Sequence, residues 1–255
     1  MQLIDTHTHI YLPEFDADRD EVIGRAIQNG IVKLVMPNID IDSVNQMLSV
    51  ANRYPEICFP MIGLHPTSVK ENPEPHLEQL LNLRTTNKFH AIGEIGIDLY
   101  RDQSRLREQI LVFKRQISIA VESDLPVVIH SRNSFREVFN AMADFAGSGV
   151  RGVFHAFTGS VADAEKAIGM GFKLGIGGIV TFKNSGLDKV VREAGLQNII
   201  LETDSPYLAP VPYRGKRNES SYLSIINNKI ADIFGLSKEE TASVTYSNSV
   251  LLFGL

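Results

Sequence analysis

The feature that most constrains the fold is a repeated alternation between short apolar runs and amphipathic segments along the whole chain. Runs such as KLVMP, LPVVIH and NIILE are almost continuously apolar, as parallel strands are when helices cover both faces of their sheet. We expect eight strands, at Leu3–Thr8, Val32–Pro37, Cys58–Leu64, His90–Ile95, Pro126–His130, Gly152–His155, Lys173–Ile176 and Asn198–Glu202.

The segments between these runs have helical periodicity and carry helix-capping residues. Segment 237–254 opens with SKEE, the pattern of a capping box, and segment 16–30 closes with Asn-Gly, a C-terminal capping signal. Helices are expected within segments 16–30, 40–54, 104–123, 133–146, 160–171, 184–195, 220–235 and 237–254.

Alternating strands and helices favour a parallel sheet, which right-handed crossovers can close into a barrel. A barrel of this kind takes roughly 250 residues, and the chain has 255. We therefore predict the α/β class, with residues 1–255 forming one (β/α)8 TIM-barrel domain. An open doubly wound sheet is the main alternative, but no glycine-rich phosphate loop follows the first run.

Composition narrows the setting of the protein. Hydrophobic residues make up 44% of the chain and charged residues 22%, as in an ordinary globular protein, and the single Cys58 fits a reducing compartment. The opening MQLIDTHTHI does not read as a signal peptide, and no run is long enough to span a bilayer. We expect a monomeric cytoplasmic enzyme with no membrane partner. A net charge of −5 argues against nonspecific coating of nucleic acid, but it leaves room for a local basic pocket.

Potential metal ligands stand where five of the predicted strands end. Active sites of TIM barrels lie at the C-terminal ends of the strands. His7 and His9 are two residues apart, so on a strand they would share one face. Imidazole and carboxylate groups gathered at one rim suit divalent ions. The predicted ligands are His7, His9, Glu94, His130, His155 and Asp204.

Each of these residues, taken alone, also has an ordinary structural explanation. Two nearby histidines can be surface or capping residues, Glu94 can be a solvated carboxylate, and Asp204 can begin a turn. His130 and His155 can be core histidines bonded to backbone. All six together at one rim would leave unpaired polar and charged groups buried unless a cation were present, and we therefore favour the metal site.

The chain resembles the TatD family of metal-dependent deoxyribonucleases, within the wider amidohydrolase-like barrel superfamily. The resemblance runs along essentially the whole chain. The matching stretches are IDTHTHI at 4–10, GLHP at 63–66, GEIGIDLY at 93–100, VIHSR at 128–132, HAFTGS at 155–160, LETDSPYLAP at 201–210 and PYRGKRNES at 212–220.

The resemblance implies two divalent metal ions, Zn²⁺, Mg²⁺ or Mn²⁺, held by matching positions. His7 and His9 would hold the first ion, Glu94 would bridge the two, and His130 and His155 would hold the second. The wider superfamily often bridges its metals with a carboxylated lysine, so Glu94 points to the TatD branch.

Asp204 and Glu94 are the predicted catalytic residues. The resemblance implies that Asp204 contacts the first metal and the attacking water, whose proton it is placed to take. Asp5 lies two residues before His7 and either supports that ligand from behind or is an ordinary buried aspartate satisfied by backbone. The chain departs from the family at Ser220, where proline is common, and in GIDLY, where GLDYY is frequent. Neither change touches a predicted ligand.

Substrate-binding residues are predicted next to the ligands. Arg214, Lys216 and Arg217 form a compact basic cluster after the eighth strand, where arginine could hold phosphate, although most charged runs are simply solvated loops. His65 in GLHP and Arg132 after the fifth strand are expected at the same rim. Three further residues start predicted strands or helices and have weaker claims to a role: His76, His90 and Cys58.

The leading functional hypothesis is a two-metal deoxyribonuclease that degrades single-stranded DNA ends from 3′ to 5′, the polarity being implied by the resemblance. Hydrolysis of a small phosphoester, lactone or amide is the second hypothesis, and a non-catalytic binding module on the same fold is the third. Glu94 and the RGKR cluster argue for a phosphate substrate, and the intact ligand set argues against loss of catalysis.

Overall fold

The computed structural model describes residues 1–100 and 102–255 of the chain. Its strands are β1 (Leu3–Asp5), β2 (Ile31–Pro37), β3 (Cys58–Met61), β4 (Ile92–Asp98), β5 (Val127–Arg132), β6 (Gly152–Phe154), β7 (Phe172–Ile176) and β8 (Ile199–Leu201). Its α-helices are α1 (Arg19–Gln28), α2 (Ile41–Arg53), α3 (Glu74–Asn82), α4 (Leu106–Glu122), α5 (Phe135–Met142), α6 (Val161–Gly169), α7 (Leu187–Ala194), α8 (Leu223–Phe234) and α9 (Lys238–Phe253).

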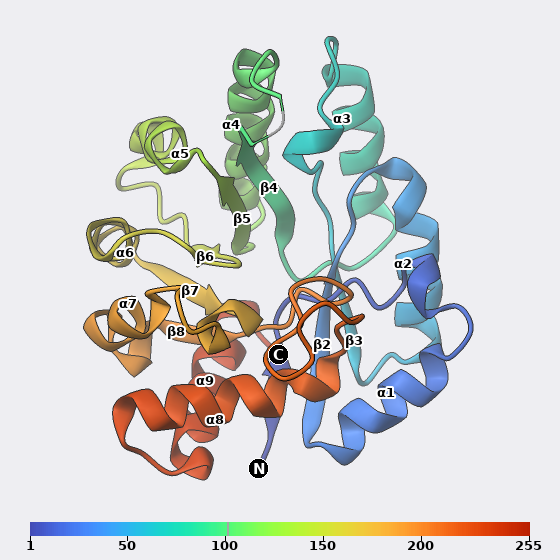
Figure 1. Cartoon of the computed structure of the whole chain (residues 1–255). Coiled ribbons are helices and arrows are strands. Elements are labelled where there is room, and N and C mark those ends of the chain that lie inside the picture. Colours follow the sequence, from blue (N-terminus) through green and yellow to red (C-terminus); the bar gives the residue numbers. More distant parts are fainter. Residues whose placement is uncertain (101) are drawn as a thin grey trace.

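The strands follow one another around a ring, and the helices lie outside it (Figure 1). All neighbouring strands pair in parallel, within a sheet of β1–β2–β3 and a second sheet of β4 to β8. Isolated bridges connect the two sheets at both joints, Ile62 with Ile92 and Thr8 with Ser205. This arrangement confirms the predicted (β/α)8 barrel.

Apolar side chains fill the barrel interior at the end opposite the candidate site. Strand residues form a small buried cluster, and Leu252 and Phe253 of α9 pack against it. The strand-side members are Ile4, Val35, Met61, Ala91, Val128, Val153 and Ile200. A second and larger cluster lies between the strands and the outer helices. Since the lower interior is packed with hydrocarbon, the polar groups of the barrel collect at the opposite, C-terminal end of the strands.

Capping interactions fix several helix ends as the sequence indicates. Ser237 and Glu240 form the predicted capping box of α9, and Gly30 after α1 has a positive φ of 84°. Helix α3 begins at Glu74 after Pro73, so His76 lies near a helix start as expected, although the sequence pattern set no bounds for this short helix. No α-helix within residues 1–100 and 102–255 is both long and apolar enough to cross a membrane.

Three expectations about strand ends are wrong in ways that affect the site. β1 ends at Asp5, so His7 and His9 lie beyond the strand and do not owe their common direction to its pleat. β4 continues to Asp98, three residues past its predicted end at Ile95. β5 continues two residues past His130. At β4 and β5, polar side chains at the barrel rim interrupt the apolar pattern before the backbone pairing stops. At β1 the pattern of IDTHTH continues after the pairing has stopped.

Candidate metal centre

Glu94 lies on a β-bulge of β4 that directs its side chain into the barrel mouth. The register between β4 and β5 shifts between Gly93 and Ile95, so Glu94 is the extra residue. Glycine is required on both sides of it. A Cβ at Gly93 would lie 2.6 Å from the Cβ of Val128, and one at Gly96, where φ is 146°, would lie 2.0 Å from the carbonyl oxygen of His130. The GEIG sequence thus brings Glu94 against β5.

Backbone hydrogen bonds between the segments after β1 and β8 position the histidine pair and Asp204. The Asp204 N–H donates to the carbonyl of His7 at 2.9 Å, and the His9 N–H donates to the carbonyl of Ser205 at 2.8 Å. Asp204 adopts a left-handed φ of 56°, which aspartate tolerates better than most residues. These contacts join the first and last strands directly below the site.

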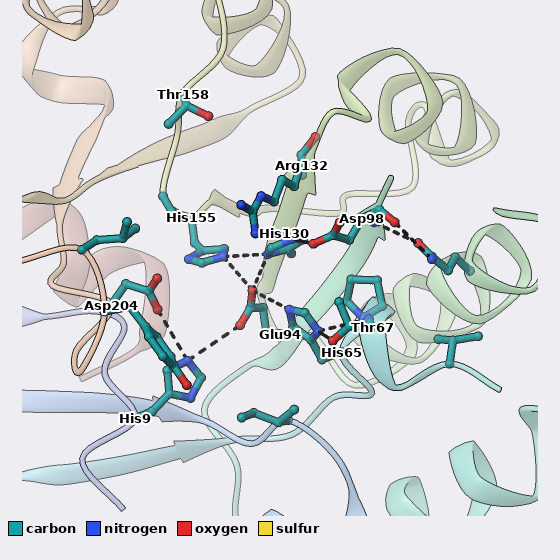
Figure 2. Close-up of a pocket in the computed structure, with 18 of the residues that line it drawn as sticks. His9, His65, Thr67, Glu94, Asp98, His130, Arg132, His155, Thr158 and Asp204 are labelled. Carbon is teal, nitrogen blue, oxygen red and sulfur yellow. Dashed lines mark hydrogen bonds and ion pairs between the residues drawn. The ribbon is translucent and has the colours of Figure 1, made fainter. Parts of the chain in front are cut away.

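Five histidines surround the Glu94 carboxylate. Its Oε1 lies 2.7 Å from both His130 Nδ1 and His155 Nε2, and 3.3 Å from His65 Nε2. Its Oε2 lies 3.3 Å from His7 Nε2 and 3.9 Å from His9 Nε2. Figure 2 shows the labelled members of this group converging on Glu94 from several strands.

Asp204 completes the cluster on the side of the histidine pair. Its Oδ1 lies 3.5 Å from His9 Nε2 and 3.7 Å from His7 Nε2. Three sets of donor atoms lie within 4.8 Å of one another and could hold an ion: His7–His155–Asp204, His7–His9–Glu94 and His65–Glu94–His130. The structure therefore brings all six predicted ligands together.

The chemistry of this donor set fits a metal centre. Both ring nitrogens of His7 are buried and make no hydrogen bond within residues 1–100 and 102–255, although carboxylate oxygens lie nearby. The His7 ring stacks on that of His155, with centroids 4.0 Å apart and planes at 12°. Unpaired nitrogens that face carboxylates across short gaps are costly in a buried site, and divalent cations relieve that cost.

The charges of the cluster perturb its titration. Burial alone would raise the pKa of Glu94, but His155, His65 and His7 outweigh burial and hold that pKa well below its ordinary value. Burial and the neighbouring His155 lower the pKa of His7. Burial also lowers the pKa of His155, yet Glu94 and Glu202 more than reverse the effect. Glu94 is consequently an anion available as a ligand.

Contacts behind the rings fix which nitrogen of each histidine faces the site. The Tyr11 hydroxyl donates to the Pro37 carbonyl at 2.8 Å, so its oxygen accepts from His9 Nδ1 at 3.1 Å and leaves His9 Nε2 free. His65 is arranged the opposite way. Its Nδ1 accepts the Thr67 N–H at 3.2 Å, so a neutral His65 carries its proton on Nε2, facing Glu94. His65 is therefore a hydrogen-bond donor to Glu94, although its ring lies close enough to Glu94 and His130 to share an ion with them.

Sequence reasoning missed two carboxylates that back the ligands. Asp98 Oδ2 lies 3.0 Å from His130 Nε2, and Glu202 Oε1 lies 3.6 Å from His155 Nδ1. A signal existed for both, because each acid stands near a predicted ligand in a stretch that carries the family resemblance, GEIGIDLY for Asp98 and LETDSP for Glu202. Their side chains point toward a histidine of another strand, which spacing along the chain does not reveal.

The cluster forms the floor of a cavity of about 840 Å³ at the C-terminal ends of the strands. His9, His65, His130 and His155 line it together with Glu94 and Asp204. Arg132 stands above the floor in Figure 2, and its guanidinium lies 3.7 Å from the centroid of the Tyr100 ring. Tyr207 also lines the cavity, with 47% of its surface exposed. A cavity of this size can admit a small ligand or the end of a chain.

The predicted basic cluster does not line this cavity. Arg217 forms two hydrogen bonds to the Asp18 carboxylate, at 2.7 and 2.9 Å, and its guanidinium lies 4.7 Å from the Phe15 ring centroid. Arg214 lies over Phe182, at 4.4 Å from the ring centroid. The contacts of Arg217 are those of a structural clamp between the segment after β8 and the one before α1.

The structure also places the residues to which sequence analysis assigned weaker or alternative roles. Asp5 is fully buried and accepts hydrogen bonds from the Thr203 N–H at 2.9 Å and the Thr203 hydroxyl at 2.6 Å, so it braces the β8 segment and not the ring of His7. Burial raises the pKa of Asp5 to about 7, against the opposing hydrogen bonds from Thr203. Cys58 is buried, and burial raises the pKa of its thiol to about 12. His76 is exposed on α3, and His90 lies before β4, away from the site.

A (β/α)8 barrel with a buried histidine–carboxylate cluster at the C-terminal end of its strands has the architecture of the metal-dependent hydrolases. The comparison with protein families identifies the branch. The chain belongs to the TatD-related DNase family, whose sequence model matches residues 4–254. It is therefore a metal-dependent hydrolase of the TatD family.

Individual relatives agree with this assignment. The chain is 36% identical to the uncharacterized metal-dependent hydrolase YabD of Bacillus subtilis, over 98% of each chain. It is 30% identical to the 3′-5′ ssDNA/RNA exonuclease TatD of Erwinia amylovora, over 99% of this chain and all of the relative. The crystal structure of the TatD homologue YjjV from Escherichia coli superposes with a TM-score of 0.92 at 28% identity, covering 99% and 98% of the two chains.

Proposed function

We propose that this protein is a two-metal nuclease that removes nucleotides from the 3′ ends of single-stranded DNA. The observation that carries the proposal is the convergence of imidazole and carboxylate groups on Glu94 at the floor of an open cavity. One ion would be held by His7, His9 and Asp204, the other by His130 and His155, with Glu94 shared between them.

Bound divalent cations would polarise the phosphoryl group and lower the pKa of a water molecule. The remaining roles belong to side chains of the chain itself. The Asp204 carboxylate faces the cavity and would orient the attacking water and accept its proton. The water oxygen forms a bond to phosphorus, and the P–O3′ bond breaks. O3′ leaves as a hydroxyl with a proton from solvent, and Asp204 returns to solvent the proton that it took from the water. The products are a 5′-nucleotide and a strand shortened by one residue.

His65 and Arg132 supply the contacts that favour a phosphate substrate. His65 lines the cavity, and its Nε2 proton, which faces Glu94 at 3.3 Å, would turn to donate to a nonbridging phosphate oxygen when substrate binds. Arg132 is exposed at the mouth, and the Tyr100 ring supports its guanidinium from one side. Exposed rings at the mouth, Tyr100 and Tyr207, are suited to stacking with unpaired bases.

The net charge of −5 is compatible with this substrate, because a few local contacts to a strand end need no extended basic surface. An exonuclease acting on DNA and RNA is named among the relatives at 30% identity. Absence of a disulfide partner for Cys58 within the chain favours action in the cytoplasm.

The test is digestion of a 5′-labelled single-stranded oligonucleotide with Mg²⁺, Mn²⁺ or Zn²⁺ added to metal-free protein. Removal of 3′ nucleotides produces a descending ladder of labelled products. An RNA oligonucleotide of the same sequence measures the preference for the sugar, and a duplex with blunt ends measures the requirement for unpaired bases.

The Asp204→Asn variant is the control for contaminating nuclease, since it should produce no ladder of shortened products. Immediate release of a labelled mononucleotide would contradict the 3′ polarity. Turnover of a small phosphoester, lactone or amide with no oligonucleotide cleavage in any metal would replace the nuclease proposal by small-molecule hydrolysis.

A further inference from the structure

Glu202 is a deeply buried acid beside the His155 ring that the proposed mechanism does not use. It follows β8 directly, and only 1% of its surface is exposed. A Cβ at Gly175 of β7 would lie 2.3 Å from Glu202 Oε2 and 3.0 Å from its Cδ, so the carboxylate occupies space that the glycine leaves open. Its Oε2 has no hydrogen-bond partner within residues 1–100 and 102–255. Burying an acid this way is costly and calls for a compensating role.

The other oxygen of Glu202 holds the turn that carries His155. Glu202 Oε1 accepts the Ala156 N–H at 2.6 Å, a short bond to a charged acceptor. Ala156 has a φ of 42°, a left-handed conformation that is unfavourable for alanine. The carboxylate therefore stabilises the strained residue directly after His155.

The same oxygen faces the outer nitrogen of the His155 ring. His155 Nδ1 is buried and makes no hydrogen bond to any residue in the described ranges, and Glu202 Oε1 lies 3.6 Å from it. That separation exceeds a hydrogen bond by about half an ångström, which a small movement of the ring would close. The inner nitrogen, Nε2, lies 2.7 Å from Glu94.

We infer that Glu202 is a positioning residue that keeps the proton of His155 on Nδ1 and thereby directs Nε2 toward the ion that His130 and His155 would hold. The two rings on this side of the site then follow one rule, since Asp98 accepts from His130 Nε2 while His130 Nδ1 faces Glu94. On the other side, the outer partner of His9 is the neutral Tyr11 hydroxyl. Glu202 therefore acts on only one of the two ions, and the inference rests on the two-ion site proposed above.

The test compares wild type with Glu202→Gln, which keeps the size of the side chain and an oxygen for the Ala156 N–H. Zn²⁺ binding is measured by competition with a chromophoric chelator, and the His155 ring is followed by ¹⁵N NMR. Outer partners of metal-bound histidines typically contribute about 10–100-fold in affinity. We expect Glu202→Gln to lower the affinity for one of the two Zn²⁺ ions by that factor and to leave the affinity for the other unchanged. The variant should also lose a slowly exchanging proton on His155 Nδ1.

Glu137→Gln on α5 is the matched control, because Glu137 pairs with Arg136 and does not line the cavity. It should bind both ions as wild type does. Wild-type protein that binds fewer than two Zn²⁺ ions would overturn the two-ion proposal, whereas the Nδ1 signal still tests Glu202, since it can be recorded without metal.

Two results would overturn the inference about Glu202 itself. One is an equal loss of affinity for both Zn²⁺ ions together with a lower melting temperature, which would mark Glu202 as a general structural residue. The other is an unchanged Nδ1 signal in Glu202→Gln. A Glu202→Ala variant is a further check. It also removes the acceptor of the Ala156 N–H, so its affinity for the same ion should fall at least as much.

Discussion

The rings of His7 and His155 stack in parallel with centroids 4.0 Å apart, although they follow strands β1 and β6 and are separated by most of the barrel sequence. Two stacked imidazoles cannot both carry a proton charge without repulsion. Their pKa values move apart accordingly, lowered at His7 by burial and His155, and raised at His155 by Glu94 and Glu202 against burial. A site built around this stack needs cations to engage the unprotonated nitrogens.

Metal removal is expected to destabilise the protein. Chelation leaves the His7 nitrogens without partners and Glu94 as a buried anion, whereas saturating metal stabilises the folded chain by mass action. At a metal concentration 100 times the dissociation constant, the stabilisation is about 2.7 kcal/mol. Calorimetric melting with EDTA and then with added Zn²⁺, Mg²⁺ or Mn²⁺ measures it. In Glu94→Gln the same additions should shift the melting temperature much less, and an equal shift would argue against a metal at Glu94.

Asp204→Asn is expected to abolish most catalysis while preserving the fold. Asparagine tolerates the left-handed φ of 56° at this position but cannot take a proton from water. Loss of a positioned base typically lowers kcat by about 10²–10⁴-fold. Steady-state cleavage of an oligonucleotide measures kcat, and Asp232→Asn, an exposed position on α8, serves as control. Retention of full activity in Asp204→Asn would remove Asp204 from the mechanism.

Arg132→Ala is expected to raise KM for oligonucleotides with little change in the melting temperature. Arg132 is exposed and lies against the ring of Tyr100, so its loss removes a phosphate contact and no buried packing. A charged hydrogen bond contributes about 1.5–3 kcal/mol, which corresponds to roughly a tenfold to hundredfold rise. Arg136→Ala is the matched control, since Arg136 lies four residues along the chain and pairs with Glu137 outside the cavity. Equal effects of the two substitutions would indicate a general charge effect.

Arg217→Ala is expected to reduce stability and to leave KM unchanged, contrary to the role that the sequence favoured. Its pair with Asp18 is one-third exposed, so a loss of about 1 kcal/mol is reasonable, or roughly 2–4 °C in melting temperature. The hydrogen bonds from Arg217 lower the pKa of Asp18 from its ordinary 3.8. A depressed carboxyl pKa stabilises the fold above pH 3.8 and ceases to do so as the pH falls through the folded value.

The stability difference between wild type and Arg217→Ala should therefore be full at pH 7 and shrink toward pH 3, as followed by thermal melts across that range. Arg214→Ala, which removes a cation–π contact and no carboxylate pair, should show no such pH dependence. A higher KM in Arg217→Ala at unchanged stability would restore the substrate role.

The amino-acid sequence alone determined the barrel and the residue types that gather at its rim. Apolar runs alternating with amphipathic segments allow few arrangements other than parallel strands covered by helices, and strand ends of such a sheet meet at one rim. His130, His155 and Asp204 could be assigned to that rim because their position follows from strand order. Details of pairing were not available, and the ends of β1, β4 and β5 were accordingly misplaced.

Only the tertiary structure decided what each side chain contacts. Glu94 reaches the histidines through a bulge, which is a property of the pairing between β4 and β5. Glu202 meets His155 and Arg217 meets Asp18, although the partners are 47 and 199 positions apart in the chain. Such contacts depend on the closure of the ring and on the direction of each side chain at its rim. Local periodicity carries neither, since it records which residues are buried and not which buried residues meet.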